Sequence, residues 1–296
     1  MGLRQQEALE VSSLIKRGNS DLESGKFVDA LEKFTKAKRM APAEPEVLFK
    51  LGLTYDYLKS PTKALQFYRK ALKLDPDMDG AWEYSGIAHH ELFEYEEALT
   101  CYDKAITLNP NYAPTFYNKA ITLEALGKLD EALTSYDRAI ALRPDADLAV
   151  ISKGELLARL GKHEEAVGVY RIALKGRRDQ TRTLFGLGKS FLAIRKNKQA
   201  LSYFRKGLEL DPRNSEAWRL AGEAAFRAKQ FQLAIDAYKK SMNLCPWNPN
   251  LYYCVADSLR LLKRQKEAVS YLEQGIRRFP NHESFRVLLQ TLRLNQ

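Results

Sequence analysis

The sequence has few cysteines, no paired cysteines and no long hydrophobic run. Its three cysteines are Cys101, Cys245 and Cys254, an odd number without a Cys-x-x-Cys pair, which argues against a disulfide framework and for a reducing compartment. We expect all three to be small buried side chains. No stretch approaches the roughly 18 apolar residues of a membrane-spanning helix, and the N-terminus lacks a secretion signal. The sequence therefore predicts a cytoplasmic protein without membrane association.

Motifs for metals, nucleotides and lipids are also missing. The four histidines are spread along the chain, without metal-ligand spacing, as His89, His90, His163 and His282. Residues 186–190 end like a phosphate-binding loop, but Thr183 stands where that motif requires glycine. Gln6 stands where a myristoylation motif has Ser or Thr. We therefore expect no metal, no cofactor, no lipid anchor and no enzymatic activity.

Prolines recur at a fixed interval along most of the chain. They lie 34 residues apart, except for one doubled step, at Pro42, Pro76, Pro110, Pro144, Pro212, Pro246 and Pro280. Arg178 occupies the place of the missing proline. The interval defines eight units, 11–44, 45–78, 79–112, 113–146, 147–180, 181–214, 215–248 and 249–282. Residues 1–10 form a leader that we expect to be helical, and residues 283–296 follow the last unit.

Small and aromatic residues repeat at fixed places within these units. The twentieth place is always alanine, and the eighth is always glycine or alanine, as in Gly52, Gly86 and Ala120. The twenty-fourth place is usually aromatic, as in Tyr68 and Tyr102. Apolar residues have helical spacing, with a break near the middle of each unit. Each unit is therefore predicted to be a helical hairpin with close helix contacts, its aromatic residues filling the gaps to the neighbouring hairpin.

This pattern resembles the tetratricopeptide repeat family. Unit 3 carries the family's characteristic residues in order, at Trp82, Gly86, Ala98, Tyr102, Ala105 and Pro110. The resemblance implies an all-α, right-handed superhelical solenoid of about eight helix-turn-helix repeats. Residues 283–296 then form a C-terminal capping helix. Unit 5 departs from the pattern at Gly176 and Arg178, where we expect an irregular junction with unit 6.

The resemblance also implies a function in protein–protein interaction. In this family the first helix of each unit lines a concave groove that binds peptide segments or partner domains. Transferring the family's ligand-facing places to this chain gives Phe49, Tyr57, Tyr84, Ile87, Tyr117, Asn118, Ile121, Ile151, Arg182, Phe185 and Lys189. We therefore expect a scaffold or adaptor whose partner presents apolar and acidic residues.

Charged residues of the later units divide into expected pairs and expected free cations. Acidic and basic residues stand three or four positions apart in Glu155/Arg159, Glu216/Arg219, Glu223/Arg227 and Asp257/Arg260, and we expect these to pair within their helices. Arg182 and Lys189 have no acidic residue among the groove places of unit 6. We expect these two cations to meet an acidic group of a ligand. The other Asp and Glu side chains of the chain are expected on solvated outer faces.

The net charge of +10 leaves alternative partners open. Basic patches of units 5–8, including residues 175–206, raise nucleic acid or an acidic polymer as an alternative partner. Because unit 3 is acidic, weak salt-sensitive homo-association is also expected. One subset of the family binds chaperone C-termini through Lys, Asn and Arg at set places, but only Asn19 fits, against Ile15, Lys50, Gly80 and Tyr84. Chaperone binding of that kind is therefore not expected.

Overall fold

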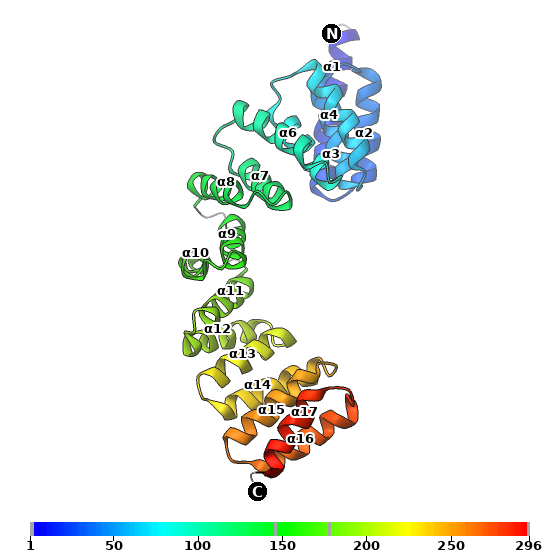
Figure 1. The fold of residues 1–296 in the computed structure, drawn as a ribbon. Helices are drawn as coiled ribbons and strands as arrows, with labels where there is room; N and C mark the ends of the chain where they lie inside the picture. Colours follow the sequence, from blue (N-terminus) through cyan, green and yellow to red (C-terminus); the bar gives the residue numbers. More distant parts are fainter. Residues whose placement is uncertain (1–2, 145–146, 177–178, 295–296) are drawn as a thin grey trace. The chain divides into compact units, whose positions relative to one another are not determined.

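A computed structural model describes residues 3–144, 147–176 and 179–294, and within these ranges every regular element is an α-helix (Figure 1). The chain divides into two compact units, residues 1–149 and 150–296, which we call the first unit and the second unit, and the 34-residue segments are called repeats from here on. In the first unit the helices are α1 (Leu3–Glu23), α2 (Phe27–Met40), α3 (Pro45–Tyr57), α4 (Pro61–Leu74), α5 (Asp79–Glu91), α6 (Tyr95–Leu108), α7 (Ala113–Ala125) and α8 (Leu129–Leu142). The predicted all-α repeat fold is confirmed.

The second unit continues the same alternation of helices. Its helices are α9 (Asp147–Arg159, beginning just before the division), α10 (His163–Gly176), α11 (Gln180–Ala193), α12 (Asn197–Leu210), α13 (Ser215–Arg227), α14 (Phe231–Leu244), α15 (Pro249–Leu261), α16 (Gln265–Arg278) and α17 (Glu283–Leu294). The last of these packs against α15 and α16 and buries Phe285 completely. Helix α17 therefore covers the end of the last hairpin. Arg178, the site of the expected irregular junction, lies outside the described residues.

Each hairpin turns at the fifteenth place of its repeat, where the backbone is left-handed. The φ angle there is positive in Gly25, Gly127 and Gly161, and also in Lys59, Phe93, Arg195, Lys229 and Lys263. The next residue donates its N–H to a carbonyl five positions back, as from Ser60 to Tyr55 at 2.9 Å. This is the hydrogen-bond pattern that ends a helix with a left-handed residue. Glycine is the favoured residue for it, but the tight hairpin imposes it on five other side chains as well.

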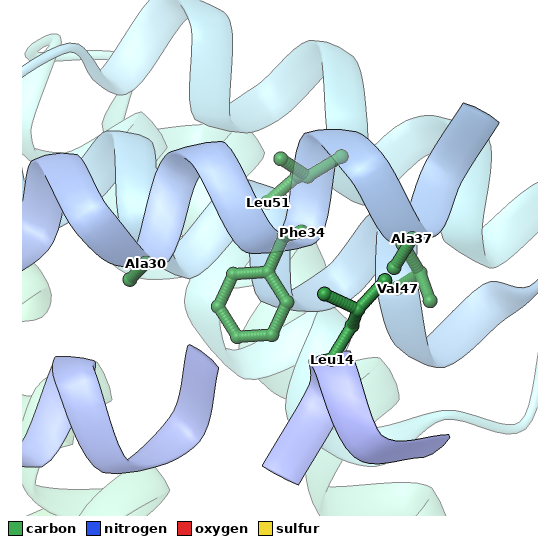
Figure 2. Close-up of a cluster of buried hydrophobic side chains, with 6 residues drawn as sticks. All are labelled: Leu14, Ala30, Phe34, Ala37, Val47 and Leu51. Atoms are coloured by element: carbon green, nitrogen blue, oxygen red, sulfur yellow. The ribbon is translucent and has the colours of Figure 1, made fainter. Parts of the chain in front are cut away.

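The aromatic ring at the twenty-fourth place packs on the eighth place of its own hairpin. A Cβ atom added to Gly18 would lie 2.6 Å from the Phe34 ring, and one added to Gly188 would lie 2.7 Å from the Phe204 ring. Figure 2 shows Phe34 of α2 beside Leu14 of α1 and Leu51 of α3, in a cluster that also contains Val47. The prediction that these rings fill the gaps towards the next hairpin holds for Phe34, and the glycine at the eighth place also gives the ring room inside its own hairpin.

Tryptophans at the fourth place join one repeat to the loop before it. Trp82 donates its indole N–H to the carbonyl of Pro76 at 2.8 Å, and Trp218 donates to Pro212 at 2.9 Å. The proline carbonyl ends one hairpin, and the tryptophan lies in the first turn of the next. The bond gives the indole N–H a partner, as a partly buried tryptophan requires. It also fixes the spacing between consecutive hairpins.

The cysteines are only partly as predicted. Cys101 is buried and Cys254 is half-buried, but Cys245 is exposed because it follows the last turn of α14. The sequence pattern did not separate a helix end from a helix interior at this position. In the described ranges, no helix is both long and apolar enough to cross a membrane.

Candidate functional site

The first helices of the repeats carry all seven predicted site residues of the first unit. Helix α5 contacts both α3 and α7. We call the surface formed by α3, α5 and α7 the first-helix wall. The predicted residues on it are Phe49 and Tyr57 from α3, Tyr84 and Ile87 from α5, and Tyr117, Asn118 and Ile121 from α7. Tyr57 is exposed and the other six are half-buried, so the wall is a largely apolar surface open to solvent.

The aromatic residues of this wall contact one another and the core beneath. The Phe49 ring lies 5.8 Å from both the Tyr84 ring and the buried Tyr68 ring. Tyr57 stacks on Phe27, the first residue of α2, with the ring centroids 4.9 Å apart. The Tyr117 ring lies 6.0 Å from the ring of Tyr136, which is buried. Because these rings are held by packing, they present a preorganised surface to a ligand.

Two carboxyl groups on this wall were not predicted from the sequence. Glu83 is 6% exposed, and Thr115 and Asn118 of α7 are its hydrogen-bond partners. Asp56 accepts a hydrogen bond from the Tyr68 hydroxyl, and its other carboxylate oxygen is buried without a partner. Burial raises the pKa of each carboxyl to about 7. The expectation that acidic residues occupy solvated faces is wrong for this pair.

The charges of both carboxyl groups act on the hydroxyl of Tyr84. Burial, followed by the charges of Tyr57, Glu83, Tyr112 and Asp56, raises the pKa of Tyr84 to about 12. Burial also raises the pKa of Tyr112, and Glu83 adds to that effect. The phenols therefore stay neutral near pH 7 and act as hydrogen-bonding groups. The repeat register could have predicted that these carboxyl groups lie on the wall. Asp56 and Glu83 stand at the twelfth and fifth places of their repeats, and both places face the ligand in the family that the sequence resembles.

A hollow lies at the start of the first unit, beside α1. It has a volume of about 670 Å³ and is lined by α1, the end of α2 and the start of α3. Its lining includes apolar Val11 and Ile15 together with Lys16 and Asn19. The carboxamide oxygen of Asn19 is buried without a hydrogen-bond partner. No site residue was predicted here, although Ile15 and Asn19 stand at ligand-facing places of the first repeat.

The predicted site residues of the second unit have different surroundings. Ile151 of α9 is fully buried, so its side chain is not available to a ligand. Arg182 of α11 forms a bidentate ion pair with Glu155 of α9, with 2.6 Å between Nε and Oε1. Phe185 is half-buried and packs against Gly207, whereas Lys189 is exposed. The expectations for Ile151 and Arg182 therefore fail, while Phe185 and Lys189 remain candidates.

Most of the expected ion pairs within helices are confirmed. Arg219 pairs with Glu216 at 2.6 Å, Arg227 with Glu223 at 2.6 Å, and Arg260 with Asp257 at 2.7 Å. The exception is Glu155, which pairs with Arg182 of the next repeat. The spacing within one helix could not reveal this pair, because its partner lies on a neighbouring hairpin. In the described part of the second unit, Lys189 has no ion pair.

His89, His90 and His282 have hydrogen-bond partners, whereas the buried Nδ1 of His163 has none. His89 contacts Glu94 at 2.6 Å, and His90 contacts the Thr122 hydroxyl of α7 at 2.8 Å. Burial lowers the pKa of His90, so its ring is largely neutral at pH 7. Outside the few undescribed residues, no group of three or more His, Cys, Asp or Glu side chains is placed to hold a metal ion.

The basic patches of the later units remain only partly visible. Arg195, Lys196 and Lys198 are exposed around the turn between α11 and α12. Arg177 and Arg178, at the other end of α11, lie outside the described residues. Lys189 of α11 and Arg205 and Lys206 of α12 are exposed as well, so nucleic acid or an acidic polymer stays an alternative partner.

Models of one repeat family match most of the chain. Those described as tetratricopeptide repeat match residues 45–78, 117–181 and 185–243, and one described as TPR repeat matches residues 94–127. No curated protein sequence matches the chain.

Solved structures of repeat proteins are similar in fold. The crystal structure of MamA is 27% identical, with a TM-score of 0.51 over 56% of this chain and 96% of that one. YrrB, described as a TPR protein with an unusual peptide-binding site, is 22% identical, with a TM-score of 0.59 over 64% and 97%. The C-terminal part of a TPR repeat-containing protein from Cytophaga hutchinsonii is 14% identical, with a TM-score of 0.69 over 81% and 99%.

Proposed function

Because the chain belongs to the tetratricopeptide repeat family, we propose that it is a non-catalytic scaffold that binds peptide segments or domains of partner proteins. The observation that carries this proposal is the first-helix wall, where aromatic and apolar side chains are held by packing but remain open to solvent. Apolar groups on such a wall lose water when a partner binds, which favours association.

The ligand-facing residues of each unit are proposed separately. In the first unit, Tyr57, Tyr84, Tyr117 and Ile121 receive apolar side chains, with Phe49 and Ile87 beside them. Asn118 of α7 carries an amide that can both donate to and accept from a peptide backbone. In the second unit, Phe185 offers an apolar contact, and Lys189, which is exposed and in no ion pair within the described residues, attracts an acidic group.

Two substitutions distinguish a side chain that contacts the partner from an exposed aromatic side chain elsewhere on the surface. With a partner isolated by affinity capture, Tyr117→Ala should weaken binding by more than about 1 kcal/mol and mainly raise the dissociation rate. The control is Phe93→Ala, which removes a side chain that is 77% exposed at a turn outside the wall. Surface plasmon resonance measures both rates, and equal effects of the two substitutions would refute the assignment of the wall.

The same partner tests the proposed role of the second unit. Lys189→Glu should slow association with an acidic partner and weaken its salt dependence, because long-range charge acts mainly on the encounter rate. Lys198→Glu is a matched control, because Lys198 is also exposed but stands on α12, outside the first helices. A larger effect of the Lys198 substitution would place the acidic contact on the outer helices.

A further inference from the structure

A small hollow lies on a different face of α5 from the first-helix wall. It has a volume of about 180 Å³ and is lined by Leu65, Arg69 and Leu72 of α4, Trp82, Ser85 and His89 of α5, and Cys101 of α6. We call it the α4–α6 hollow. Residues three or four apart share one face of a helix, so positions 82, 85 and 89 lie on another face from the wall residues Tyr84 and Ile87.

The hollow coincides with places at which two other repeats have aromatic rings. At the eleventh and twenty-third places, repeats 2 and 6 each have a stacked pair, with ring centroids 5.4 and 5.3 Å apart, formed by Tyr55 with Phe67 and by Phe191 with Tyr203. Repeat 3 has His89 and Cys101 at these places, and at the seventh it has Ser85 where repeat 2 has Leu51. The space left open in repeat 3 is therefore space that aromatic rings fill elsewhere in the chain.

The polar groups on the inner side of the hollow are already satisfied or neutral. Burial raises the pKa of Cys101 to about 11, so its thiol is uncharged at pH 7. The Ser85 hydroxyl donates to the carbonyl of Ala81 at 2.6 Å, and Nδ1 of His89 contacts Glu94 at 2.6 Å. With Leu65, Leu72 and Trp82 beside them, these groups form a surface that favours an apolar ligand.

Arg69 brings a positive charge to the hollow. Its side chain is exposed, and in the described part of the first unit it is in no ion pair. At the same twenty-fifth place of repeat 5, Arg171 lies over the Phe191 ring of the next repeat, 5.7 Å from the centroid. An arginine at this place thus reaches the eleventh-place side chain of the following repeat. In repeat 3 that side chain is His89, and Arg69 lines the open space instead.

We propose that the α4–α6 hollow binds a small aromatic carboxylic acid, with its ring in the space that rings fill in repeats 2 and 6 and its carboxylate on Arg69. Since an apolar cavity of about 150 Å³ holds benzene, this hollow has room for one ring with a small substituent. A guanidinium pairs with a carboxylate through two parallel hydrogen bonds. This ligand site is separate from the first-helix wall, so it is a function beyond the scaffold.

The test compares three small probes that separate the ring from the charge. Benzoate has both, benzamide has the ring without the charge, and acetate has the charge without the ring. Nuclear magnetic resonance titration of the full chain, with ¹⁵N-labelled tryptophan, follows the indole signal of Trp82. Benzoate should shift this signal with a dissociation constant of about 1 mM. Benzamide should bind about fivefold more weakly, the size of an exposed ion pair, and acetate about tenfold more weakly because it buries no ring.

The role of Arg69 is tested by a substitution that leaves the hollow open. Arg69→Gln should lower the affinity for benzoate to that for benzamide, and the affinity for benzamide should not change. The control is Arg39→Gln, which removes an exposed arginine of α2 that does not line the hollow. It should leave both affinities unchanged. An equal loss of benzoate affinity in the two variants would mean that net charge, not Arg69, attracts the acid.

The ring-shaped space is tested by filling it with the side chains of repeat 2. His89→Tyr together with Cys101→Phe should abolish benzoate binding, because the added rings enter space that is open in the parent. Circular dichroism should show a denaturation midpoint no lower than that of the parent. If this variant does not fold, the three probes and Arg69→Gln still decide the proposal.

The remaining outcomes would overturn the site or its occupant. An unchanged Trp82 signal at about 10 mM benzoate, ten times the expected dissociation constant, would exclude the site, as would equal binding of acetate and benzoate. N-acetylphenylalanine, a mimic of a C-terminal phenylalanine, should bind more weakly than benzoate because it exceeds a ring-sized space. Tighter binding would assign the hollow to the chain end of another protein instead of a free acid. None of these results affects the wall, which Tyr117→Ala tests separately.

Discussion

Phe204→Ala is expected to lower the free energy of unfolding by about 3–5 kcal/mol, because it removes a fully buried ring and leaves a cavity. The ring packs on Gly188 of α11, so no neighbouring side chain on that side can move into the space. Both effects, lost burial and an unfilled cavity, act in the same direction. Urea denaturation followed by far-ultraviolet circular dichroism measures the change.

The matched control is Leu210→Ala on the same helix, α12. Leu210 is 53% exposed, so its truncation should change stability by no more than about 0.5 kcal/mol. A similar loss of stability in both variants would mean that Phe204 does not fill the space between α11 and α12. The packing of the aromatic place on the glycine place would then be wrong.

Gly86→Leu is expected to cost about 3 kcal/mol by the opposite mechanism, overpacking. A Cβ atom at this position would already lie 2.5 Å from the Tyr102 ring, and leucine adds three further carbons. The ring cannot move away easily, because Tyr102 is only 1% exposed. Alanine should be tolerated much better, since Ala120 fills the equivalent place of the next repeat beside Tyr136.

An exposed glycine in another helix gives the control for this second prediction. Gly168 lies in α10, and an added Cβ atom would meet nothing within 4 Å. Gly168→Leu should leave the protein equally stable or raise its stability by up to about 1 kcal/mol, because leucine favours helix more than glycine does. Gly86→Leu should therefore lower the denaturation midpoint, whereas Gly168→Leu should leave it unchanged or raise it. A shift in the same direction would mean that backbone propensity, not the ring contact, explains the glycine.

The hairpins could be predicted because their signals recur in every repeat. A 34-residue interval, a small eighth place and an aromatic twenty-fourth place together fix which helices touch. The turn was only partly predicted, because glycine marks it in three hairpins and Lys59 or Phe93 adopts the same left-handed backbone elsewhere. There the hairpin geometry overrides the preference of the individual residue.

The chemistry of the wall was harder to predict than its position. Asp56 and Glu83 are charged by type, so composition assigns them to solvent, but Asp56 bonds to Tyr68 of its own hairpin and Glu83 to Thr115 and Asn118 of the next. Arg182 seemed free within its own repeat and is paired with Glu155 from the previous one. The register places both carboxyl groups on the wall, but their burial and the Arg182 pair depend on contacts with other helices, which the spacing within a single helix does not contain.

We propose that partners bind on the first helices of the repeats rather than on the second. The most direct measurement is photo-crosslinking of a captured partner from benzoylphenylalanine placed at Tyr57 of α3 or at Lys104 of α6, both of which are exposed. We expect a covalent adduct from the position of Tyr57 and none from that of Lys104. An adduct from the position of Lys104 alone would contradict it.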